Sequence, residues 1–60
     1  MNHPEADYIR AGYRYESAQG PDRARAEAQR IRAMLTSETP DDQTEARRLI
    51  DQGRQEARSR

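Results

Sequence analysis

The stretch PDRARAEAQRIRAMLT, residues 21–36, carries the clearest structural signal in the chain. Its apolar residues recur at helical spacing, with Ala24, Ala28, Ile31 and Leu35 separated by four, three and four positions. On a helical wheel these residues fall within about 60° of one another. The stretch is therefore predicted to form an amphipathic helix whose apolar stripe consists of two small residues followed by two larger ones.

Residues 40–57, PDDQTEARRLIDQGRQEA, repeat this spacing. Ala46, Ile50, Gly53 and Ala57 form a second stripe, and Leu49 lies beside it. Small residues at such positions let helix backbones approach closely. We expect the two helices to pack as an antiparallel hairpin, with an apolar seam of Ala24, Ala28, Ile31, Leu35, Ala46, Leu49, Ile50 and Gly53.

The helix starts are marked by three prolines, Pro4, Pro21 and Pro40, each followed closely by acidic residues. Proline is tolerated at the first helical position, and acids there favour the positive end of the helix dipole. Thr39 can also cap the third start through its hydroxyl group. These signals predict helices over residues 4–19, 21–36 and 40–57, and the absence of alternating patterns predicts no strand. At Gly20 and Pro21 the chain could either turn between two helices or kink within one.

The N-terminal helix has apolar residues around a broad arc. Tyr8, Gly12 and Tyr15 share one stripe, while Ile9 and Tyr13 lie roughly 100–140° away from it. One neighbouring helix cannot cover both sides, so this pattern is typical of a bundle made from more than one chain.

Length and composition leave little material for a core. The chain has 60 residues, of which 32% are hydrophobic, and nine of those are alanines. Folding a chain of this size hides roughly 6,000 Å² of surface. If a little over half of that surface is apolar, its burial contributes about 90 kcal/mol. Ordering the chain costs about 90 kcal/mol, so an average chain of this length has little net stability.

A chain this poor in large apolar residues is expected to gain stability by association. We expect one small helical domain over residues 1–60, with residues 55–60 frayed. The fold class is predicted to be all-α, a helical hairpin plus an N-terminal helix, assembled as an oligomeric helical bundle.

Motifs for catalysis are absent. There is no cysteine, the single histidine is His3, and no Gly-Lys-Ser phosphate loop or paired-histidine metal motif occurs. The sequence therefore predicts a protein that is not an enzyme and has no cofactor and no metal. The lack of cysteine suits a reducing compartment, and no long apolar run is present. A cytoplasmic location without a membrane span is expected.

Charge is balanced overall but segregated along the chain. Eleven arginines and eleven acids cancel, with no lysine. Residues 23–36 hold four arginines and one glutamate, whereas residues 37–45 hold four acids and no base. Such blocks suit charge pairing between helices of one chain or of two. They also leave open a basic surface for nucleic acid, formed by Arg23, Arg25, Arg30 and Arg32.

The function predicted from these features is a non-catalytic protein–protein interaction module, an adaptor or regulator. Its partners are itself, most simply as a homodimer, and another protein. The predicted partner-binding residues are Tyr8, Ile9, Tyr13, Tyr15, Ile31, Leu35, Leu49 and Ile50. Two alternatives are a small dimeric DNA- or RNA-binding regulator that uses the four arginines, and a chain that folds only on its partner.

Overall fold

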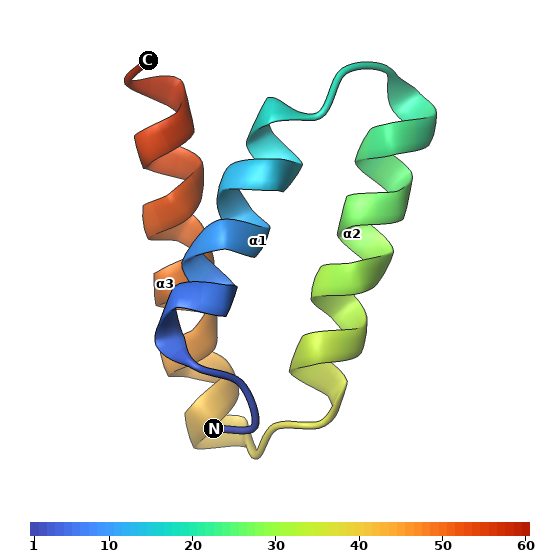
Figure 1. The fold of residues 1–60 in the computed structure, drawn as a ribbon. Helices are drawn as coiled ribbons and strands as arrows, with labels where there is room; N and C mark the ends of the chain where they lie inside the picture. Colours follow the sequence, from blue (N-terminus) through green and yellow to red (C-terminus); the bar gives the residue numbers. More distant parts are fainter.

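The computed structural model describes all 60 residues as three helices joined by short loops. Helix α1 spans Glu5–Ser17, α2 spans Pro21–Thr36 and α3 spans Pro40–Arg58. In Figure 1, α1 and α3 run side by side in the same direction, and α2 returns in the opposite direction. The predicted all-helical fold with three helices and no strand is confirmed.

The helix starts follow from local chemistry. Pro21 and Pro40 occupy the first positions of α2 and α3, and the Thr39 hydroxyl accepts a hydrogen bond from the Asp42 amide at 3.2 Å. Helix α1 begins one residue after the predicted start, with Pro4 as its N-cap. Gly20 has a φ of 89°, a conformation that favours glycine, and the chain turns there instead of kinking.

The closest helix pair differs from the predicted one. Helix α3 packs mainly against α1, while α2 has less contact with α1 and least with α3. Two glycines explain this arrangement. A Cβ atom at Gly12 would overlap the backbone of Ile50, and one at Gly53 would overlap the backbone of Ile9. The hairpin of α2 and α3 is therefore antiparallel and joined by a short loop, but its helices do not share the tight seam that the sequence suggested.

The apolar core lies mainly between α1 and α3. Tyr8, Ala46, Leu49 and Ile50 are buried, and Tyr8 is fully covered. Around them pack the half-buried side chains of Ile9, Ile31, Met34 and Leu35. Met1 is the one large apolar residue that is exposed. The chain thus covers most of its large apolar groups by itself, although its fully buried core is small.

A polar cluster fastens the N-terminal segment to the loop between α2 and α3. The buried Tyr8 hydroxyl donates a hydrogen bond to the carboxylate of Glu38, which is also buried. The backbone amide of Asn2 donates to the same carboxylate oxygen at 2.7 Å. Gln43 closes the loop from α3 by donating to the Leu35 and Glu38 carbonyls at 3.0 and 3.2 Å.

The end of α3 is helical through Arg58, which includes four of the six residues predicted to fray. No helix is long and apolar enough to cross a bilayer.

Candidate functional site

The residues predicted to bind a partner divide into two groups. Tyr8, Leu49 and Ile50 are buried in the chain's own core and have little surface left for a partner. The other five are half-buried, and they are Ile9, Tyr13, Tyr15, Ile31 and Leu35. Of these, Ile31 and Leu35 lie together, on the side of α2 that faces α3. The accessible part of the predicted surface is therefore divided between α1, which carries Ile9, Tyr13 and Tyr15, and the side of α2 that faces α3.

A groove with a mixed apolar and polar lining runs between α2 and α3, and we call it the α2–α3 groove. It consists of two adjoining hollows that share Ile31, Leu35 and Arg47. Ala28 adds to the apolar lining at one end, and Ile50 reaches it from the core at the other. This groove exists because α2 leans on α1 and leaves its apolar stripe only partly covered by α3.

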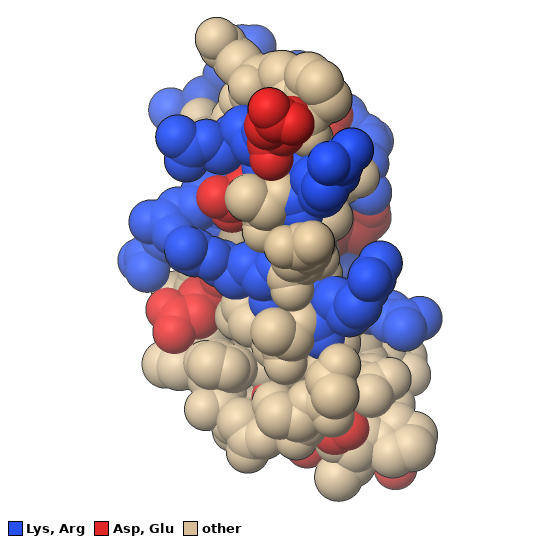
Figure 2. Space-filling model, turned by 90° about the vertical axis from the view of Figure 1, so that its right-hand side faces the viewer, with Lys and Arg blue, Asp and Glu red and all other residues tan.

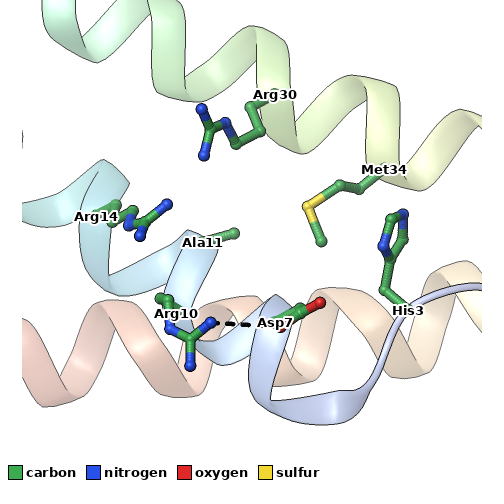
Figure 3. Close-up of a pocket in the computed structure, with 7 residues that line it drawn as sticks. All are labelled: His3, Asp7, Arg10, Ala11, Arg14, Arg30 and Met34. Carbon is green, nitrogen blue, oxygen red and sulfur yellow. Dashed lines mark hydrogen bonds and ion pairs between the residues drawn. The ribbon is translucent and has the colours of Figure 1, made fainter.

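A second, more polar groove runs between α1 and α2, and we call it the α1–α2 groove. It also consists of two hollows, which share Arg14 and Arg30. In Figure 3 the side chains of Arg14 and Arg30 extend from opposite helices into one hollow, with Ala11 and Met34 beside them. Asp7 lines the same hollow but is already bonded to Arg10 at 3.4 Å.

The four arginines of α2 are exposed, and none of them is in an ion pair. Figure 2 views the molecule from the side of α2 and shows basic side chains over the upper and middle parts of that face. The arginines flank the helix on both sides: Arg23 and Arg30 line the α1–α2 groove, and Arg32 lines the α2–α3 groove. The predicted basic residues therefore remain free to meet an anionic partner.

Other arginines have partners within the chain. Arg54 and Arg58 of α3 hold Glu16 of α1 at 2.9 and 3.2 Å. The hydrogen bonds from Arg54 and then Arg58 lower the pKa of Glu16. The Arg54 guanidinium also lies 5.1 Å from the centre of the Tyr15 ring. This contact ties the half-buried Tyr15 to the α1–α3 interface.

Two residues that line the α1–α2 groove, Glu27 and Arg14, are not among the site residues predicted from sequence. Glu27 of α2 is only 7% exposed, and its Oε2 atom has no hydrogen-bond partner. Arg14 of α1 faces the same groove as Arg23 and Arg30. The order Arg23, Glu27, Arg30 places all three on one side of a helix. Sequence could therefore have indicated their shared face, but not that α1 would cover Glu27.

Histidine and acidic residues form no group of three or more that could hold a metal ion. The α1–α2 groove is lined by arginines together with polar and acidic side chains, among them His3, Asp7, Ser17 and Glu27. The α2–α3 groove is lined by apolar side chains together with Gln43, Arg47 and Asp51.

Searches against protein families, curated proteins and solved structures find no match to this chain. The grooves and the charges around them are therefore the basis for assigning a function.

Proposed function

We propose that the chain is a non-catalytic protein–protein interaction module that acts as a homo-oligomer, most simply a dimer, in an adaptor or regulatory role. The α2–α3 groove is its self-association surface. The observation that carries this proposal is the position of Ile31 and Leu35, which remain only half-buried because α2 has little contact with α3. Covering them removes further apolar surface from water, which favours association.

Charge complementarity favours a second copy as the occupant of the groove. Its charged lining consists of Arg32, Arg47, Arg54 and Asp51. Arg54 is held by Glu16, whereas Arg32 and Arg47 are in no ion pair. The start of α3 carries the exposed Asp41 in a segment with no basic residue, whereas the adjacent Asp42 already lies 3.5 Å from the N-terminal amino group. Two copies packed with α3 antiparallel would bring Asp41 toward the partner's arginines, while the apolar linings meet in the centre.

Sedimentation of the full chain over a roughly hundredfold concentration range tests this proposal. We expect the mass to rise with concentration, and Ala28→Gln to abolish the rise by placing a larger polar side chain in the groove. Ala33→Gln is the matched control because Ala33 is exposed on the same helix and lines neither groove. Circular dichroism shows whether each variant keeps its helices.

A concentration-independent monomer with full helix content would contradict the proposal. Equal loss of association in both variants would also contradict it, since the groove would then have no special part.

A second candidate is a small DNA- or RNA-binding regulator, and the unpaired arginines of α2 favour it. Arg23, Arg25, Arg30 and Arg32 are exposed on one helix, where they could neutralise several phosphates of a nucleic acid. The second acid of this helix, Glu27, is buried and adds little negative charge to the surface.

This candidate predicts that binding to duplex or single-stranded DNA weakens steeply as salt rises. Replacing both Arg25 and Arg32 by glutamine should lower the salt dependence by about one counterion for each arginine. Arg48→Gln serves as the control, because Arg48 lies on α3 and is paired with Glu45 at 3.2 Å. No retention on either nucleic acid at low salt excludes this function.

A further inference from the structure

The α1–α2 groove gathers three guanidinium groups that have no carboxylate partner. Arg14 comes from α1, and Arg23 and Arg30 come from α2. None of the three is in an ion pair. Like charges that line one groove repel each other, and an anion placed between them relieves that repulsion. Arginine also binds phosphate groups through paired N–H donors.

Glu27 provides a second, independent feature in the same groove. It is 7% exposed, and its Oε2 atom is buried without a hydrogen-bond partner. A buried carboxylate oxygen is costly to leave unpaired. A ligand that carries an N–H or O–H donor could supply the missing hydrogen bond while its anionic group meets the arginines.

We infer that the α1–α2 groove binds a nucleotide, that is, a phosphate monoester that also carries hydrogen-bond donors. The three arginines and Glu27 together hold two positive charges, which matches the charge of a phosphate monoester near neutral pH. The larger hollow has a volume of about 600 Å³, within the range of small-ligand sites. The half-buried Tyr13 lies on its wall, with the Arg60 guanidinium 5.7 Å from the centre of its ring, and a base would stack on the other face of that ring.

This site goes beyond the proposed self-association and does not depend on it. The nucleotide groove and the α2–α3 groove have no lining residue in common. The Ala28→Gln variant can therefore be used to measure ligand binding when association is blocked. Failure of one proposal is then separable from failure of the other.

Calorimetric titration of the full chain at low salt, with AMP, adenosine and inorganic phosphate as probes, tests the inference. We expect AMP to bind more tightly than phosphate and adenosine not to bind. Arg14→Gln and Arg30→Gln should each weaken AMP binding about tenfold or more. Arg25→Gln is the matched control, since Arg25 is an exposed arginine of α2 outside this groove. Absence of AMP binding, or an equal loss in the control, overturns the site.

The part played by Glu27 is tested with Glu27→Gln. Removing its negative charge should help inorganic phosphate, while AMP loses a charged acceptor for its donor group. The ratio of AMP affinity to phosphate affinity should therefore fall about fivefold. An unchanged ratio in a variant with full helix content overturns the assignment to a nucleotide.

A short single-stranded DNA without terminal phosphates distinguishes free nucleotide from nucleic acid as the source of the phosphate. Weaker binding per site than AMP supports a nucleotide site. Binding of the DNA in the absence of AMP binding shows that diesters are the ligand and overturns the inference.

Discussion

Gly12 and Gly53 determine how closely α1 and α3 approach. Each lies against the backbone of the other helix: Gly12 faces Ile50, and Gly53 faces Ile9 and the amide of Tyr13. Any side chain at either position would occupy the space of a backbone atom, which cannot swing away as a flexible side chain can. The close crossing is therefore set by two residues that have no side chain.

Gly53→Ala is predicted to destabilise the fold by about 1–3 kcal/mol, because the new methyl group forces α1 and α3 apart. The direction of the effect is informative, since alanine on an exposed helix face would stabilise by up to about 1 kcal/mol. Urea denaturation followed by circular dichroism measures the change. Gln52→Ala, an exposed neighbour on α3, should change stability by less than about 0.5 kcal/mol. A more stable Gly53→Ala variant would show that the helices do not meet there.

At the scale of the helices, the sequence predicted the elements better than their partners. The bounds of α2 agree with the prediction, and α3 ends one residue later than predicted. Proline at the first helical position and the Thr39 cap are local signals that do not depend on the rest of the fold. Helix α1 ends at Ser17, two residues before the predicted end, because Ala18 already has an extended conformation.

Which helices pair is a different kind of information. A stripe of small and apolar residues shows which face of a helix is buried, but not which other helix covers it. Two stripes of similar spacing suggested that α2 pairs with α3. However, Gly12 lies in the stripe of Tyr8 and Tyr15, and a glycine at this position lets the backbone of another helix approach α1 closely. The sequence feature that indicated the observed pairing of α1 with α3 was therefore the glycine in the stripe of each helix, Gly12 and Gly53.

Like the helices, the residues of the two grooves could be predicted only in part from the sequence. Ile31, Leu35 and the arginines of α2 lie on accessible surfaces because they belong to the helix that packs least closely. Tyr8 is buried because Glu38, 30 positions away, provides a partner for its hydroxyl group. The roles of Arg14 and Glu27 depend on how α2 lies against α1, and spacing within one helix does not contain that information.

For the molecule as a whole, burial and size are those of a compact single chain. The Cα radius of gyration is 11.0 Å, and nine residues are buried. Much of the enclosed surface is alanine, glycine and buried polar groups, so few large side chains hold the helices together. The polar cluster around Tyr8 is consequently a substantial part of what ties the N-terminal segment, α1 and the α2–α3 loop into one unit.

The stability of the whole molecule should therefore depend on pH at both extremes. Hydrogen bonds from Tyr8 and then the Asn2 amide lower the pKa of Glu38. Because the pKa of Glu38 is lower in the folded chain than its ordinary value of 4.5, this carboxylate stabilises the fold above about pH 4.5. Its contribution is lost as the pH falls further. Burial and the bond to Glu38 raise the pKa of Tyr8 from 10.0 to about 12. Its contribution is complete below pH 10 and is lost as the pH rises toward 12.

Tyr8→Phe tests the alkaline part of this dependence. The variant should be less stable by about 1–2 kcal/mol at neutral pH, because a buried hydrogen bond is lost. Its stability should also fall less than that of the original chain between pH 10 and 12, because the ionising hydroxyl is gone. Tyr13→Phe is the control, since its half-buried ring has no hydrogen bond to remove. Urea denaturation at a series of pH values gives both quantities, and parallel curves for Tyr8→Phe and the original chain would show that the buried hydroxyl does not govern the alkaline limb.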